Sequence, residues 1–264
     1  MNKRLLLVLI GFGLLLAACV PTKDLIYLQK KGTQQENSEV SQIASKPYRL
    51  QVSDIISITI KANDPKLVEI FSPKNQILEG NRTETGLYYD GFSVDDHGNV
   101  RMPILEEVNV LGKTLDEVRL HIEERLLKEY FNKEANIFVT VKLSGFRYTI
   151  NGEVNAPGSK VLYVDKLNIM EAIANAGDIT MTGNRHKVTV IRQTPSGYEM
   201  NDIDLTDVNA MKSPYYYIKP NDYIYVKPLK QKSWGTGKTG IESLSTILSV
   251  LTLITTTLIL LRNK

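Results

Sequence analysis

Short runs of alternating hydrophobic and polar residues fill the chain between Tyr48 and Val226. Alternation with a period of two is typical of β-strands that bury one face. The runs predict a strand, a turn at Ser53-Asp54 and a second strand within 48–60, and then a hairpin over 92–103 with its turn at Asp96 to Asn99. Further strands are predicted over 135–143, from Phe146 to a turn at Pro157-Gly158, and over 187–193, 198–205 and 223–226.

Two segments carry a helical pattern instead. Thr114 and Glu117 form a capping box, after which apolar residues recur at helical spacing to about Tyr130. A shorter helix begins at Asn168 and ends at Gly177, where glycine suits the left-handed backbone of a helix terminus. This order of elements predicts an α+β fold with two small, β-rich mixed domains over 47–144 and 145–228.

One pattern occurs twice in the chain. When Asp222 is aligned with Asp54, Tyr216 falls on Tyr48 and the neighbouring apolar positions also coincide. The repeat indicates that a similar strand-turn-strand unit opens the first domain and closes the second. Independent use of the same turn chemistry would give the same pattern, so no function is inferred from it.

The segment 241–261 contains a single charged residue and otherwise only aliphatic residues, serines and threonines. As a helix it would be about 31 Å long, the thickness of the hydrocarbon core of a bilayer, so it is predicted to cross a membrane. One face collects the polar residues Glu242, Ser245, Ser249, Thr252 and Thr256. The opposite face collects Leu244, Leu248, Leu251, Ile254 and Leu258.

Two structures fit this amphipathic helix. A monomeric anchor could use its hydroxyl groups for helix packing, where small polar residues are frequent. Alternatively, the helix is one stave of a barrel that faces lipid with its aliphatic side and lines a pore with its hydroxyl side. The regular spacing of the hydroxyl residues favours the barrel.

The N-terminus has the pattern of a bacterial lipoprotein signal peptide over 1–18. Lys3 and Arg4 precede an apolar run that is too short to span a membrane, and Cys19 follows two alanines. Cys19 is the only cysteine and is predicted to carry the lipid, followed by a flexible tether over 19–46. Residue 20 is valine rather than aspartate, which favours the outer membrane, with the body in the periplasm.

Residues around the predicted span have the character of a membrane interface. Trp234, Lys232 and Lys238 lie in the linker 229–240, and Arg262 and Lys264 lie in the basic terminus 262–264. Indole rings and lysines are enriched where a membrane meets water. These five residues are therefore predicted to contact the interface and the outer-membrane lipid.

Composition and motifs argue against other classes of function. A hydrophobic content of 42% suffices for a core, and a net charge of +3 gives no reason to expect nucleic acid. Asp95-Asp96-His97 lies in a turn where acids bond local backbone, and Gly237-Lys238-Thr239 lacks the first glycine of a phosphate-binding loop. We expect no metal, no cofactor and no enzymatic activity.

Thirteen tyrosines raise the alternative of sugar stacking. They cluster at Tyr88-Tyr89 and at Tyr215-Tyr216-Tyr217. Aromatic rings are also common in sheet cores, and this second role is favoured here.

These motifs together resemble the Wza-like outer-membrane polysaccharide export lipoproteins. The resemblance rests on the Cys19 site, on Tyr48-x-Leu-x-x-x-Asp54-x-Ile, on Val94-Asp-x-x-Gly98-x-Val-x-x-Pro103 with Gly112-x-Thr114, and on Asn151-Gly152-Glu153-Val154-x-x-Pro157-Gly158 before Ala176-Gly177. It implies a polysaccharide export domain, one soluble-ligand-binding β-grasp domain, and a ring of identical subunits whose terminal helices form a pore. It also implies polysaccharide as cargo and an inner-membrane chain-length and tyrosine-kinase partner.

The chain departs from the family pattern in two places. The family usually continues its hairpin as Pro-x-x-Gly, whereas here Glu106 stands where that glycine is expected. Larger members also have a second β-grasp domain, and its absence here implies a shorter periplasmic vestibule.

Overall fold

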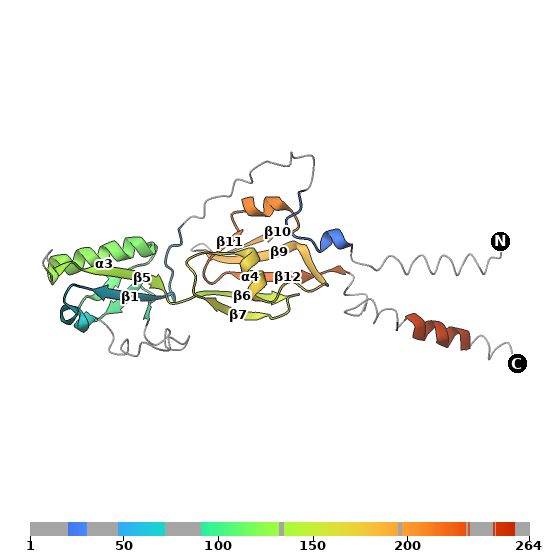
Figure 1. The fold of residues 1–264 in the computed structure, drawn as a ribbon, viewed down its shortest axis with the longest axis horizontal. Helices are drawn as coiled ribbons and strands as arrows, with labels where there is room; N and C mark the ends of the chain where they lie inside the picture. Colours follow the sequence, from blue (N-terminus) through green and yellow to red (C-terminus); the bar gives the residue numbers. More distant parts are fainter. Residues whose placement is uncertain are drawn as a thin grey trace.

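The computed structural model describes residues 21–30, 47–71, 91–131, 135–194, 197–230, 232, 245 and 247–256. Figure 1 shows two folded bodies side by side, each a mixture of strands and helix. Each body has its own cluster of buried hydrophobic side chains. The predicted mixture of strands and helices in several small sheets is therefore confirmed.

The first domain is a small antiparallel sheet covered by one helix. Strand β1 (Ile55–Lys61) lies between β2 (Phe92–Ser93) and β5 (Phe138–Leu143), and α3 (Leu115–Glu129) packs against it. A separate hairpin is formed by β3 (Asn99–Met102) and β4 (Glu106–Asn109). The short 3-10 helices η3 (Pro65–Leu67) and η4 (Glu69–Phe71) follow β1.

The core of the first domain follows from the alternation in the sequence. Ile56, Ile58 and Ile60 point from one face of β1 toward the buried stripe of α3, while the residues between them lie on the opposite face. The predicted capping box of α3 is present, since Thr114 Oγ1 accepts from Glu117 N at 3.2 Å and Glu117 Oε2 accepts from Thr114 N at 2.8 Å. These bonds satisfy two backbone donors that the helix leaves open.

The second domain is built on a five-stranded sheet in the order β10-β9-β12-β6-β7. Its strands are β6 (Phe146–Gly152), β7 (Gly158–Leu162), β9 (Gly183–Thr194), β10 (Gly197–Ile203) and β12 (Tyr223–Pro228). A smaller pair joins β8 (Leu167–Asn168) to β11 (Tyr217–Ile218), beside α4 (Ile169–Asn175) and the 3-10 helix η7 (Val208–Lys212). Strands β12 and β6 run parallel, while the other pairs in the sheet are antiparallel.

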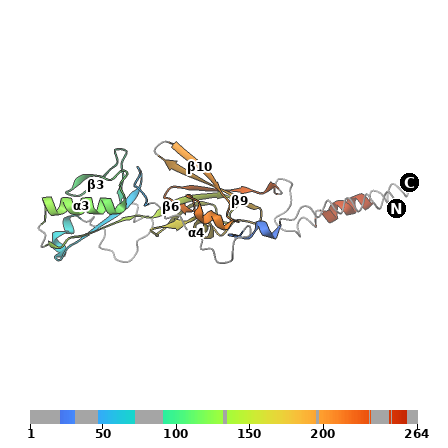
Figure 2. The same cartoon turned by 90° about the horizontal axis from the view of Figure 1, so that it is seen from above.

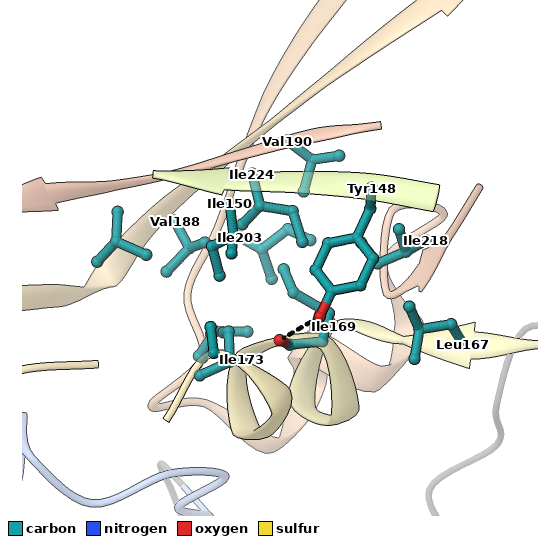
Figure 3. Close-up of a cluster of buried hydrophobic side chains, with 14 of the residues drawn as sticks. Tyr148, Ile150, Leu167, Ile169, Ile173, Val188, Val190, Ile203, Ile218 and Ile224 are labelled. Atoms are coloured by element: carbon teal, nitrogen blue, oxygen red, sulfur yellow. Dashed lines mark hydrogen bonds between the residues drawn. The ribbon is translucent and has the colours of Figure 1, made fainter. Parts of the chain in front are cut away.

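Figure 3 shows the core between this sheet and α4. Ile150, Val188, Val190 and Ile224 meet Ile169 and Ile173 of the helix. The fully buried ring of Tyr148 lies among them, and its hydroxyl donates to the Ala172 carbonyl at 2.8 Å. A buried hydroxyl needs such a partner, so this bond fixes α4 on the sheet.

Two of the strand predictions were wrong in part. The arm before Ser53-Asp54 is not a strand: Leu50 N donates to the Lys113 carbonyl and the Leu50 carbonyl accepts from Gly112 N. The predicted turn at Asp96 to Asn99 is present, but the strands beside it pair elsewhere, β2 with β1 and β3 with β4. Local alternation reports which face of a strand is buried and not which strand lies next to it.

Residues 21–30 belong to the second domain, which corrects the prediction of a tether over 19–46. They include the 3-10 helix η2 (Thr22–Asp24), and Leu28 N and Gln29 N donate to the carbonyls of Leu205 and Thr206 at 3.0 and 2.7 Å. Gln29 also forms an isolated parallel bridge with Asp207. The first domain is thus inserted, along the chain, between two parts of the second. The remainder of the predicted tether lies outside the described residues.

The far C-terminus contains a helix in the predicted place, described at residues 245 and 247–256. Figures 1 and 2 both show it at the end of the molecule opposite the first domain, the same end as η2. Within the residues that the structure describes, no helix is long and apolar enough to cross a membrane. Ten of the 21 residues of the predicted span 241–261 lie outside the described part of the chain.

The backbone conformation between β3 and β4 can be tested by its effect on stability. Glu106 has a φ of +54°, a left-handed conformation that costs a residue with a side chain about 1–2 kcal/mol. Because glycine adopts it freely, we expect Glu106→Gly to raise the free energy of unfolding by about 1 kcal/mol, despite the greater entropy of an unfolded glycine. Urea unfolding of the detergent-solubilised protein measures the change.

The neighbouring residue is the matched control. Glu107 is also exposed and lies in β4 with no left-handed backbone, so Glu107→Gly should lower the unfolding free energy by about 1 kcal/mol. Equal effects of the two substitutions would contradict the assignment of strain to Glu106.

Candidate functional site

The repeated pattern around Asp54 and Asp222 forms two similar turns. Ser53 and Asn221, the residues before the two aspartates, have φ values of +70° and +66°. In each turn the aspartate accepts from the backbone three residues earlier, Asp54 from Gln51 N and Asp222 from Lys219 N, both at 2.8 Å. The repeat is therefore one of structure in the turn and in the strand that follows it, although only the second turn also has a strand before it.

The two carboxylates have different partners. Asp222 Oδ2 lies 2.6 Å from Arg192 Nη2, and Arg192 Nε lies 2.9 Å from the other carboxylate oxygen, so the ion pair is bidentate and buried. Asp54 has no cationic partner among these contacts and accepts instead from the Tyr48 hydroxyl at 2.7 Å. Burial raises the pKa of the Asp54 carboxyl, although its bonds from Gln51, Tyr48 and Asn221 act in the opposite direction.

The turns meet at the junction of the two domains. Asn221 Nδ2 of the second turn donates to Asp54 Oδ1 of the first at 3.2 Å. A cavity of about 340 Å³ adjoins this bond and is lined by residues of both domains, among them Ser144 and Arg147. Asp54 therefore holds the first domain to the second as well as closing its own turn.

A larger groove, of about 600 Å³, also lies between the domains. Hydroxyl residues of β1 and β5 contribute one part of its lining, including Ser57, Thr59 and Thr140, and the second domain contributes Phe146, Leu162 and Tyr163. Lys142 and Asp165, which also line the groove, form an ion pair between the domains at 3.9 Å. An aromatic ring beside hydroxyl and charged groups can bind a sugar by stacking and hydrogen bonds.

Sequence reasoning missed this groove because no local motif marks it. Its hydroxyl residues occupy alternate positions of β1 and β5, on the face opposite the core. The alternation predicted only that this face is not buried in its own domain. The groove exists because the second domain lies beside that face.

The described part of the C-terminal helix carries four of the residues predicted to line a pore, Ser245, Ser249, Thr252 and Thr256. Ser249 and Thr252 donate through their side chains to the carbonyls of Ser245 and Leu248, both at 2.8 Å, and Thr256 donates to the Thr252 carbonyl. These bonds to the preceding turn lower the cost of a hydroxyl in an apolar environment. Leu248, Leu251 and Ile254, predicted to face lipid, are about half exposed in the single chain.

Most other predicted membrane residues lie outside the described part of the chain. They are Cys19, Trp234, Lys238, Glu242, Leu244, Leu258, Arg262 and Lys264. Lys232, predicted to contact the membrane interface, is described and forms an ion pair with Glu153. This pair ties the chain beyond β12 to the turn after β6.

The tyrosine and acidic motifs have structural roles where they are described. Tyr216 is buried in the core, and the Tyr215 hydroxyl donates to Glu199 at 2.6 Å. Asp95 accepts from the backbone of His97 and Asn99 at 2.9 and 2.8 Å, the local role expected of a turn. Across the described ranges, no three histidine, cysteine or carboxylate side chains form a group that could hold a metal ion.

Two family descriptions match the chain, one over most of each domain. "Polysaccharide biosynthesis/export protein" covers residues 42–142, and "SLBB domain" covers residues 147–226. The chain belongs to the Wza-like polysaccharide export proteins. The first domain is accordingly called the export domain and the second the SLBB domain.

Curated relatives support the assignment. The chain is 27% identical over 179 residues to the "EPS I polysaccharide export outer membrane protein EpsA" of Ralstonia solanacearum, covering 65% of this chain and 46% of that protein. The protein of the same description from Ralstonia nicotianae is 27% identical over 165 residues, covering 60% and 42%. The chain thus spans less than half the length of these relatives.

The junction of this export protein can be tested through pH. Because burial raises the pKa of Asp54, the native state binds its proton more tightly than the unfolded state does. Its contribution to stability is therefore greatest below about pH 4, the ordinary aspartate pKa, and is lost as the pH rises through the raised value. We expect Asp54→Asn to remove this contribution, which urea unfolding at a series of pH values would detect.

The predicted signature is the difference between wild type and variant. The free energy of unfolding of the wild type, relative to that of Asp54→Asn, should fall as the pH rises above about 4. Asp165→Asn, at the exposed ion pair beside the groove, is the control for the loss of a carboxylate between the domains and should change the free energy of unfolding by less than about 1 kcal/mol. A relative stability of the wild type that rises with pH would contradict the raised pKa of Asp54.

Proposed function

We propose that this protein is an outer-membrane subunit of a conduit that exports an exopolysaccharide or capsular polysaccharide. Its two domains lie in the periplasm, and the protein acts without catalysis. Membership of the export family supports this proposal, as do the relatives described as export outer membrane proteins.

The observation that carries the membrane part of the proposal is the exposure of the C-terminal helix. Apolar side chains of Leu248, Val250, Leu251, Leu253 and Ile254 are all 49% exposed or more in the single chain. A contiguous apolar surface of this kind needs lipid or another protein surface to cover it. We infer that the helix continues over 241–261 as a membrane span.

A pore requires several copies of the chain. One helix has no lumen, but a ring of helices can turn Glu242, Ser245, Ser249, Thr252 and Thr256 inward and the leucine face outward. We propose a homo-oligomeric ring on this basis. The hydroxyl groups that bond their own helix keep acceptor capacity for water in the lumen.

Further contacts complete the proposed assembly. Cys19 carries the lipid, and Trp234, Lys238, Arg262 and Lys264 contact the two membrane interfaces. An inner-membrane component that sets chain length and has tyrosine-kinase activity is the proposed partner of the export domain. The interdomain groove, with Tyr163 beside hydroxyl groups, is a candidate contact for the polymer.

The alternative function is a lipid-anchored scaffold or carbohydrate-binding module with a monomeric tail anchor. It shares the two domains and the membrane helix and lacks the pore. The groove between the domains is compatible with such a module. The two functions differ in whether the hydroxyl face of the helix contacts water.

Deletion of the gene tests the proposed export. We expect surface polysaccharide to disappear while polymer synthesis continues, because a conduit acts after the polymer is made. Immunoblotting for polymer in the cell and at its surface measures both quantities. Polymer that is released but not attached would favour the surface-binding module, and loss of all polymer would favour an enzymatic or regulatory function.

Cysteine scanning from Leu244 to Leu258 tests the pore. A membrane-impermeant thiol reagent should label cysteines at 245, 249, 252 and 256 and spare those at 248, 251, 254 and 258, because only the first set contacts a water-filled lumen. Labelling is measured by the mass shift of each variant. A monomeric anchor would be labelled only near its two ends.

A pair of charge substitutions gives an independent check. Thr252→Lys should be tolerated in the lumen, whereas Leu251→Lys should cost about 3 kcal/mol at the centre of the bilayer and deplete the protein. Equal depletion of the two variants in membrane fractions would contradict the pore.

A further inference from the structure

Both ends of the described chain leave the SLBB domain at one place. The N-terminal segment enters at η2, where Asp24 lies 3.2 Å from His186, near the start of β9. The C-terminal end of β12 pairs with the same region, Pro228 with Gly183, and Leu229 N donates to the Thr182 carbonyl at 2.8 Å. Both views show this end pointing away from the export domain (Figures 1 and 2).

The inference rests on the proposed membrane anchorage and concerns how far the SLBB domain can lie from the lipid on Cys19. Asp24 is the first residue of the described chain that forms an ion pair or hydrogen bond with the rest of the SLBB domain, and it follows Cys19 by five residues. Five residues of fully extended chain span at most about 18 Å. A lipid on Cys19 therefore keeps this end of the domain close to the bilayer.

The side chains at this end suit contact with lipid. Met181, in the turn between Ile179 and Gly183, is 62% exposed, and Ile26 of the N-terminal segment is 50% exposed. Lys23, Lys187 and Lys230 are also exposed. Apolar side chains at a loop tip, with lysines around them, match the interface of an anionic bilayer.

Carboxylates at the same end have partners within the domain. Asp24 and Asp204 both face His186, at 3.2 and 3.3 Å. Glu153 is paired with Lys232 and accepts from the hydroxyls of Thr180 and Thr182. The acidic groups thus have partners within the domain, while lysines face outward.

We propose that this end of the SLBB domain is a lipid-docking surface. Met181 and Ile26 enter the headgroup region of the bilayer, and Lys23, Lys187 and Lys230 contact the phosphates of anionic phospholipids. The SLBB domain then contacts the membrane surface directly and is not separated from it by flexible linkers.

Fluorescence quenching in the full-length protein tests this surface. A single cysteine replaces Met181, is labelled with an environment-sensitive probe, and is studied in phosphatidylcholine–phosphatidylglycerol vesicles that contain a nitroxide-labelled lipid. We expect at least about a twofold loss of fluorescence, because interfacial side chains enter the bilayer by several ångströms. Vesicles of phosphatidylcholine alone should quench less, since the lysines lose their anionic partners.

Ile70→Cys is the matched control. Ile70 is also 62% exposed, and it lies in η4 of the export domain, at the opposite end of the molecule (Figure 1). A probe there should be quenched by aqueous iodide and not by the nitroxide lipid. Equal nitroxide quenching at both positions would overturn the proposal. A probe at residue 181 that is quenched only by iodide would also overturn it. A probe that neither reagent quenches would overturn it too and would indicate a protein partner.

A preliminary measurement distinguishes failure of the membrane anchorage from failure of the docking surface. Flotation shows whether the protein binds vesicles, and quenching is measured only in the floated fraction. The unsubstituted protein should take up no thiol probe, because lipidation consumes Cys19. Uptake of probe would argue against the lipid anchor, whatever the result at residue 181.

Discussion

The buried ion pair between Arg192 and Asp222 is the interaction on which the arrangement of the two domains depends. Arg192 also donates to the Tyr217 carbonyl at 3.1 Å, and its guanidinium lies 4.8 Å from the centre of the Tyr215 ring. One side chain of β9 therefore holds β11 and the loop that leads into β12. Since a buried charge without its partner is strongly destabilising, this loop has little freedom to change shape.

The fixed loop is the one that contacts the export domain. Asn221 immediately precedes Asp222 and presents its amide to Asp54. Asp54 in turn closes a similar turn, so the contact joins two turns that are each closed by an aspartate. The lining of the groove beside this contact depends on that constraint, because Thr59 and Tyr163 come from different domains.

Sequence patterns predicted local structure well and long-range pairing poorly. The capping boxes at Thr114 and Asn168 lie within four residues of the groups they satisfy, so they could be recognised from spacing alone. The partners of β2 and β3 could not be, because alternation does not encode register between distant segments. The docking of residues 21–30 gave no periodic signal, since it depends on single contacts such as Tyr27 with Asp178 and Gln29 with Thr206. The groove also could not be predicted, because it is formed by the surfaces of two domains and not by one segment of the sequence.

The insertion of the export domain between two parts of the SLBB domain has a mechanical consequence. A pull applied between the two ends of the chain would run through residues 21–30, across Leu205 and Thr206, and out along β12. The export domain lies outside that path and would carry none of the load. Under the proposed anchorage of both ends, tension and bending of the membrane would strain the SLBB domain, and the turn at Asp54 would stay beside its partner.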